Sequence, residues 1–94
     1  MINADWKIKT FPELSTAELY EIIKARVNVF VVEQACPYPD LDDYDQIAIH
    51  LWAENDGEVL AYCRIFDRGI KYPETSIGRV ITTERGEGQD WENN

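Results

Sequence analysis

The sequence contains no long apolar run, few basic residues, two cysteines and a single histidine. Its apolar stretches are short and interrupted by charge, so none approaches the roughly 20 residues that a membrane span requires. The first residues lack the basic and apolar regions of a secretory signal peptide, which favours a cytoplasmic protein. With 9 basic against 18 acidic residues the formal net charge is −9. An acidic protein repels phosphate backbones, which disfavours nucleic-acid binding.

The histidine and the cysteines offer little for catalysis or metal binding. Cys36, His50 and Cys63 lack the spacing of a zinc site. Without an export signal, the two cysteines are expected to remain thiols whose first role is packing. His50 could act as a base, but its place beside Trp52 on an alternating segment favours a structural role. The aspartates within residues 40–45 do not follow the calcium loop of an EF-hand, so no metal site is predicted.

The composition and the patterns along the chain predict one small domain that contains both a helix and strands. The 94 residues are 45% hydrophobic, which can fill a single core. Period-two alternation predicts strands over residues 6–11, 46–54, 59–66 and 75–83. Asn55, Asp56 and Gly57 supply the turn of a hairpin between the second and third strands. Gly78, inside the last strand, predicts a bulge or a close approach by another backbone or a ligand.

One helix is predicted between the first two strands. Ser15 is its N-cap, and Glu18 completes a capping box three residues later. Apolar residues recur at spacings of three and four over residues 19–30, so one face packs inward, and the helix is expected to fray after Phe30. The element order predicts an α/β (α+β) fold, a mostly antiparallel sheet of about four strands with a helix packed on one face.

A long connection follows the helix over residues 31–45, where prolines and aspartates replace any periodicity. Long ordered loops in compact domains are often functional. Its aspartates could contact a cationic amine or a basic partner, and a solvated acidic loop is the alternative. Arg64 and Arg79 lie on adjacent predicted strands. They could form structural ion pairs or line a cleft, and a structural role is favoured for Arg64.

Three segments carry a resemblance to a known family. Residues 26–42 resemble the signature R-x-x-V-F-V-V-E-Q-x-C-P-Y-x-D-x-D of ElaA-like proteins in the GNAT superfamily of N-acetyltransferases. Residues 61–65 resemble the second strand of the family's hairpin, and residues 77–81 resemble its I-G-R-V segment. The resemblance covers residues 6 to about 86. It implies the N-terminal part of the GNAT acyl-CoA N-acyltransferase fold.

The resemblance also implies an activity, the transfer of an acetyl group from acetyl-CoA to a primary amine. In the family, the coenzyme's extended amide arm pairs with the main chain of the fourth strand, as a peptide does when it adds to a sheet edge. The corresponding residues here are Val80, Ile81 and Thr82. In the family, the region of Glu33 and Gln34 lines the acceptor side of the cleft. Tyr38 and Asp40 could contact a cationic amine there, with a solvated acidic loop as the alternative. For Glu33 and Gln34, a polar pair that caps the helix end is an equal alternative. No catalytic residue is identified.

The sequence departs from the family after the fourth strand. A loop of the type R-G-x-G-[I/L]-G-[K/R] normally opens a helix whose N–H groups bind the pyrophosphate. Arg85, Gly86 and Gly88 match its beginning and are the predicted coenzyme residues of this loop. Gln89 and Asp90 stand where an apolar residue and the third glycine belong.

The genetic code suggests a reason for this departure. Read one base later, the codons of residues 90–92 encode Ile or Thr, then Gly, then Lys or Arg. We therefore expect residues 1–84 to form a partial GNAT domain and residues 85–94 to be an acidic tail outside the family pattern, through truncation or a frameshift. The DNA that follows codon 94 would test this.

Two non-enzymatic alternatives stay open. One is a non-catalytic remnant or interaction module that forms a homodimer through the exposed edge of its fourth strand, because an uncovered edge recruits a partner. The other is an acidic protein that binds basic partners through residues 40–45.

Overall fold

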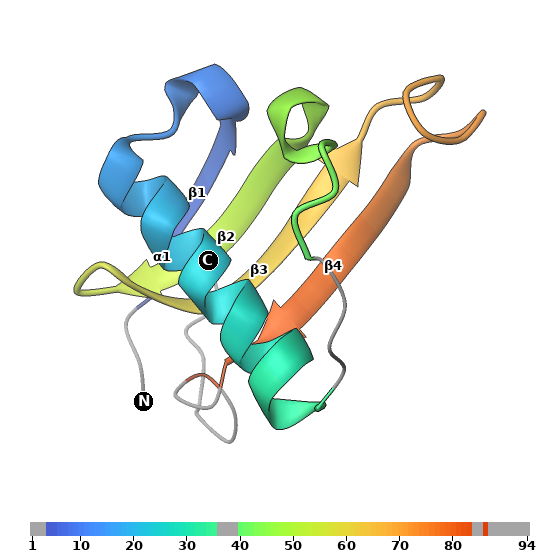
Figure 1. Ribbon diagram of the computed structural model, residues 1–94. Coiled ribbons are helices and arrows are strands. Elements are labelled where there is room, and N and C mark those ends of the chain that lie inside the picture. Colours follow the sequence, from blue (N-terminus) through green and yellow to red (C-terminus); the bar gives the residue numbers. More distant parts are fainter. Residues whose placement is uncertain (1–3, 36–39, 84–85, 87–94) are drawn as a thin grey trace.

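The computed structural model describes residues 4–35, 40–83 and 86. It shows a four-stranded antiparallel sheet in the order β1-β2-β3-β4, crossed on one face by a helix (Figure 1). The strands are β1 Asp5–Thr10, β2 Ile49–Asn55, β3 Glu58–Phe66 and β4 Ser76–Thr82. The predicted fold class and all four predicted strands are confirmed. The second strand begins later than predicted, because Asp45–Ile47 form a short 3-10 helix.

The helix α1, Thr16–Val27, begins at the predicted capping box. The Ser15 hydroxyl accepts from the Glu18 N–H at 3.0 Å, and the Glu18 carboxylate accepts from the Ser15 N–H at 2.9 Å. Glu18 also pairs with Lys7 and Lys9 of β1, at 3.3 and 2.9 Å. Partial burial opposes its ionisation, but the hydrogen bonds from Ser15, Lys9 and Lys7 lower the pKa of Glu18 to about 2. One carboxylate therefore caps the helix and fastens it to the sheet.

The helix does not fray after Phe30, so that expectation is wrong. It continues as a π-helix, Asn28–Glu33, and the Gln34 N–H donates to the Val29 carbonyl at 3.1 Å. This bond spans five residues, the spacing of a π-helix, and such segments are frequent at functional sites. The added length places Glu33 at the last turn.

The hairpin between β2 and β3 has the predicted turn. Asn55 pairs with Glu58, so Asp56 and Gly57 form a two-residue loop. Both have positive φ, 52° and 80°, as a type I′ turn requires. The long strands of this hairpin carry most of the core.

The core lies between α1 and the sheet. Trp52 and Tyr62 from the centre of the sheet pack with Ile22 of α1, Val29 of the π-helix and Ile81 of β4. Side chains alternate along a strand, so those of β1 that do not face the helix point to the opposite face. Trp6 and Ile8 do so and are 48% and 62% exposed. No helix among the described residues is long and apolar enough to cross a membrane.

Candidate functional site

The strand β4 lies at the edge of the sheet and contains a bulge. Tyr62 faces Ile81, whereas Arg64 faces Gly78, so this stretch of β4 holds one residue more than the matching stretch of β3. Arg79 within it has a φ of 51°. An extra residue in the left-handed region is the geometry of a β-bulge. The bulge predicted from Gly78 is therefore present.

The predicted coenzyme residues lie next to the bulge, on an edge strand of the described sheet. Within the described part of the chain, β4 pairs with β3 alone. The Ile81 side chain is buried in the core, whereas Val80 is 68% exposed and Thr82 is also exposed. A strand paired on one side leaves main-chain N–H and C=O groups on its other side without a strand partner. This is the accessibility that the resemblance requires.

After β4 the chain stays close to β3. The Thr83 N–H donates to the Leu60 carbonyl at 2.9 Å, and the Gly86 N–H donates to the Thr83 carbonyl at 2.9 Å. A Cβ atom on Gly86 would overlap the carbonyl oxygen of Leu60, so packing requires a glycine there. The other two residues predicted for the pyrophosphate loop, Arg85 and Gly88, lie outside the described residues.

Three arginines and three aspartates form a closed ring of ion pairs above the sheet. The arginines come from α1, β3 and β4, and the aspartates from the connection after the helix. Each arginine contacts two aspartates and each aspartate contacts two arginines, in the order Arg26, Asp40, Arg79, Asp42, Arg64, Asp45 and back to Arg26. We call this set the charge ring. Its formal charges cancel, which is how buried charges are normally tolerated.

Most of the charge ring is buried. The exposed fractions are 0% for Arg26, 1% for Arg64 and 5% for both Asp40 and Asp45. Hydrogen bonds from Arg64 hold the pKa of Asp42 well below its ordinary value, despite partial burial. The ring therefore fastens the acidic segment, residues 40–45, to the helix and to two strands.

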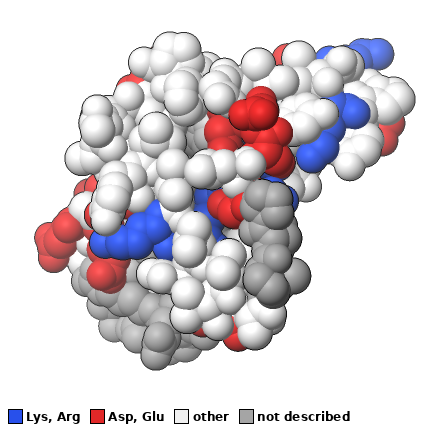
Figure 2. Space-filling view, viewed as in Figure 1, with Lys and Arg blue, Asp and Glu red and all other residues white. Residues whose placement is uncertain are grey.

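The positions of the ring residues test two predictions made from the sequence, one for Arg64 and one for Asp40. The structural role favoured for Arg64 is confirmed. Asp40, predicted to contact an amine, instead binds Arg26 and Arg79, with closest distances of 2.9 Å to each. Its carboxylate is thus engaged within the chain, as is that of Asp42. Figure 2 shows acidic and basic side chains beside one another on this face rather than one continuous acidic surface. Tyr38 lies outside the described residues.

His50 is a buried structural residue, as predicted. It is 0% exposed, with Nε2 at 2.9 Å from the Asp45 carbonyl oxygen and Nδ1 at 2.6 Å from the Tyr62 hydroxyl. A carbonyl only accepts, so Nε2 carries a proton and donates to it, while Nδ1 shares a hydrogen bond with the Tyr62 hydroxyl. Burial lowers the pKa of His50. The imidazole is buried and both of its nitrogens are engaged, so it is unavailable to a substrate.

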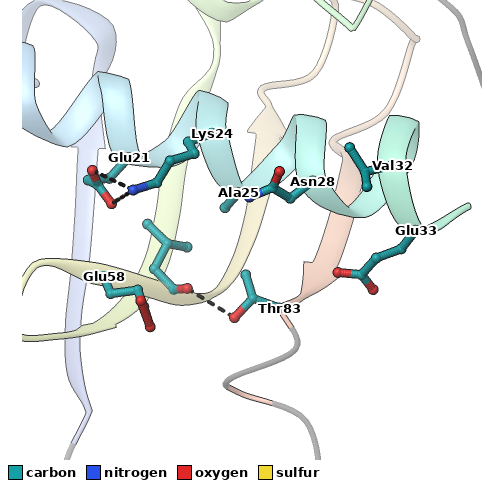
Figure 3. A pocket seen from close by; sticks show the side chains of 9 residues that line it. Glu21, Lys24, Ala25, Asn28, Val32, Glu33, Glu58 and Thr83 are labelled. Carbon is teal, nitrogen blue, oxygen red and sulfur yellow. Dashed lines mark hydrogen bonds and ion pairs between the residues drawn. The ribbon is translucent and has the colours of Figure 1, made fainter.

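A groove of about 680 Å³ runs between the helix and the ends of β3 and β4 (Figure 3). It is lined by Glu21, Lys24, Ala25, Asn28, Val32, Glu33, Glu58, Val59 and Thr83. Figure 3 shows Glu33 reaching from the last helical turn toward Thr83, which follows β4. Of the predicted acceptor residues that the structure describes, Glu33 lines the groove, whereas Gln34 is exposed at the end of the helix.

The helical wall of the groove was not expected to line a site. Glu21 and Lys24 occupy positions that the helical pattern assigns to solvent, and they form an ion pair at 3.0 Å. No local sequence signal distinguishes such a wall from an ordinary wet face. The described residues include no group of three or more His, Cys, Asp or Glu that could hold a metal ion. Cys63 is a free thiol whose pKa is raised by burial.

No family model matches the chain. It is 39% identical over 90 residues to a UPF0039 protein of Synechocystis sp., an alignment that takes in 93% of this chain and 58% of that protein. An acyl-CoA N-acyltransferase structure from Pseudomonas aeruginosa superposes with a TM-score of 0.85 at 40% identity. The structure of Escherichia coli ElaA superposes with a TM-score of 0.83 at 36% identity. Both superpositions take in 92% of this chain and 60% of the other.

The chain thus spans about three fifths of the length of these relatives. Similarity in sequence and in coordinates points to the same group, and it agrees with the signature in residues 26–42. Over the part that it shares with these relatives, the chain belongs to the ElaA-like proteins of the GNAT superfamily.

Proposed function

We propose that the chain takes part in acyl transfer from acetyl-CoA to a primary amine, with the open edge of β4 as the place where the coenzyme's amide arm binds. The observation that carries this proposal is the edge position of Val80, Ile81 and Thr82 directly after a bulge. The solved relative from Pseudomonas aeruginosa, named an acyl-CoA N-acyltransferase, supports the choice of reaction.

The chemistry is direct transfer. The neutral amine attacks the thioester carbon, the C–S bond breaks, the amine proton passes to a base and the thiolate takes up a proton. A main-chain N–H near the bulge would stabilise the negative charge that develops on the carbonyl oxygen. His50 has no part in this reaction, because it is buried and both ring nitrogens are engaged.

For the acceptor side we propose Glu33 as the main contact. It lines the groove and reaches toward the end of β4, where a carboxylate would attract a protonated amine. Gln34 and Tyr38 stay in the proposal as neighbours of Glu33 in the sequence. We do not propose that Asp40 contacts the amine, because its carboxylate forms ion pairs within the charge ring.

A titration followed by NMR tests the coenzyme site. Acetyl-CoA should shift the backbone amide signals of Val80, Ile81 and Thr82, while those of β1, Asp5–Thr10, stay in place. The strand β1 is a suitable internal control because it forms the opposite edge of the same sheet. Pantetheine alone should shift the same β4 signals, whereas adenosine 3′,5′-bisphosphate should not. No response of β4 to millimolar acetyl-CoA would rule the proposal out.

The comparison between these ligands also tests the loop after β4. Arg85, Gly86 and Gly88 would extend the site toward the pyrophosphate. If they do, acetyl-CoA should bind more tightly than pantetheine. Equal affinity would restrict the proposed site to the strand itself.

Self-association through β4 is a second candidate. The edge strand exposes two large apolar side chains, Ile77 at 64% and Val80 at 68%. Light scattering after size-exclusion chromatography should then report a dimer, and Val80→Lys should abolish it, because lysine on an edge strand blocks pairing. Ile8→Lys is the matched control, since Ile8 is 62% exposed on the other edge. A monomer at high concentration would contradict this candidate.

A further inference from the structure

Arg79 combines two features that no other described residue shares. It occupies the left-handed region at the bulge of β4, with a φ of 51°, and it is a member of the charge ring. Residues other than glycine adopt this conformation at a cost in free energy, and they keep it only where the surroundings hold them there. The contacts of its side chain are therefore relevant to the shape of the strand.

The Arg79 guanidinium is held by the acidic segment. Its Nε donates to Asp40 Oδ1 at 2.9 Å, and its Nη2 donates to the Asp40 carbonyl at 3.1 Å and to Asp42 Oδ2 at 3.3 Å. The guanidinium carbon also lies 5.9 Å from the centre of the Phe30 ring, on the π-helix. These contacts fix both the position and the plane of the side chain.

The aspartates that hold Arg79 are themselves fixed. Asp40 is bound by Arg26 of α1, both through its carboxylate and through a 3.0 Å hydrogen bond to its carbonyl. Asp42 is bound by Arg64 of β3, with Arg64 Nη1 at 2.8 Å from Asp42 Oδ1. Arg79 is thus anchored to a frame built from the helix and the neighbouring strand. Such a frame can compensate for an unfavourable backbone conformation.

We propose that Arg79 is a positioning residue, whose anchorage in the charge ring keeps the β4 bulge in its left-handed conformation and so sets the direction of the main-chain groups of Val80, Ile81 and Thr82. The part of this inference that concerns the coenzyme rests on the proposed function. The part that concerns the strand does not, because it can be observed without any ligand.

Amide hydrogen exchange tests the effect on the strand. In Arg79→Met, the protected amides of residues 78–82 should exchange about tenfold faster, the factor that corresponds to 1.4 kcal/mol of local opening. Arg68→Met is the matched control, because Arg68 is exposed and carries the same charge. In Arg68→Met, the amides of residues 78–82 should exchange at the same rates as in the parent protein.

Two further variants separate anchorage from general loss of structure. Arg79→Lys should restore part of the protection, because an ammonium still pairs with a carboxylate but cannot match the fork of a guanidinium. Asp42→Asn removes the charge that pairs with Arg64 and Arg79 from the most exposed aspartate of the ring, whose side chain is 23% exposed. It should speed exchange in the same residues even if Arg79→Met fails to fold.

Calorimetry with acetyl-CoA on the same variants completes the test. Faster exchange together with weaker binding in Arg79→Met, and neither change in Arg68→Met, supports the inference in full. If the parent protein does not bind acetyl-CoA, the proposed function fails, while faster exchange still supports the positioning role. Unchanged exchange of residues 78–82 in Arg79→Met and in Asp42→Asn would overturn the inference, whatever the binding result.

Discussion

The most specific prediction from the charge ring concerns the substitution of Asp45. Its Oδ1 accepts from Arg26 Nη1 at 2.7 Å and from Arg64 Nη1 at 3.0 Å, and the residue is only 5% exposed. Asp45→Asn keeps the size of the side chain and one acceptor oxygen but removes the negative charge. The ring would then hold three guanidinium groups and two carboxylates, with Arg26 and Arg64 almost fully buried.

Removing one member of a buried ion pair costs about 3–5 kcal/mol, because the partner charge stays buried without compensation. The remaining acceptor oxygen and the other two carboxylates lessen this loss, so we expect Asp45→Asn to lower the free energy of unfolding by about 3 kcal/mol. In a domain of this size each kcal/mol lowers Tm by about 4–8 °C, which gives a fall of about 12–24 °C.

Asp43→Asn is the matched control. Asp43 lies two residues away, is exposed and has a φ of 66°, a conformation that asparagine also tolerates. The substitution makes the same change in net charge and should alter stability by no more than about 0.5 kcal/mol. Urea and thermal unfolding followed by circular dichroism measure both variants. An equal effect of the two would refute the reasoning, since long-range charge rather than the ring would then govern stability.

Four further predictions concern single residues. Ser15→Ala removes the helix cap and should lower the free energy of unfolding by about 1 kcal/mol in urea titrations. Gly86→Ala should lower Tm, because its Cβ would overlap a backbone carbonyl, whereas Gly78→Ala should not, since nothing lies within 4 Å of a Cβ there. The imidazole of His50 should remain neutral, with the proton on Nε2, when its nitrogen NMR signals are recorded at about pH 6, below the pKa of an ordinary histidine. Glu18 has a pKa of about 2 against an ordinary 4.5, so its stabilisation is complete above pH 4.5 and is lost as the pH falls toward 2; Glu18→Gln should reduce the loss of stability over that range.

The elements that could be predicted from the sequence are those that depend on short-range chemistry. The capping box joins Ser15 to a residue three positions away, and the hairpin turn needs only Asp56 and Gly57 in the left-handed region. The bulge in β4 was indicated by Gly78, although the residue in the left-handed region is its neighbour Arg79. In each case the residues that specify the feature lie within three positions of one another in the chain.

The features that could not be predicted depend on partners distant in the sequence. The hydrogen bonds within the charge ring join residues 14 to 39 positions apart, and no local pattern states which arginine meets which aspartate. The π-helix is similar, because the apolar spacing that predicts α1 does not reveal the wider turn that follows it. The groove is formed only when the helix lies across the ends of β3 and β4, so its helical wall resembles any solvated face.

The charge ring also changes what the acidic composition means. Asp40, Asp42 and Asp45 are neutralised by three arginines, so they add nothing to the net charge of −9 and offer no free carboxylate to a cationic acceptor. The attraction for an amine must then come from other carboxylates, and among those that line the groove Glu33 reaches toward the end of β4. The acidic segment and the acceptor contact are therefore different parts of the molecule. The segment determines the shape of the strand that would hold the coenzyme, and the end of the π-helix supplies the charge that would draw the amine to it.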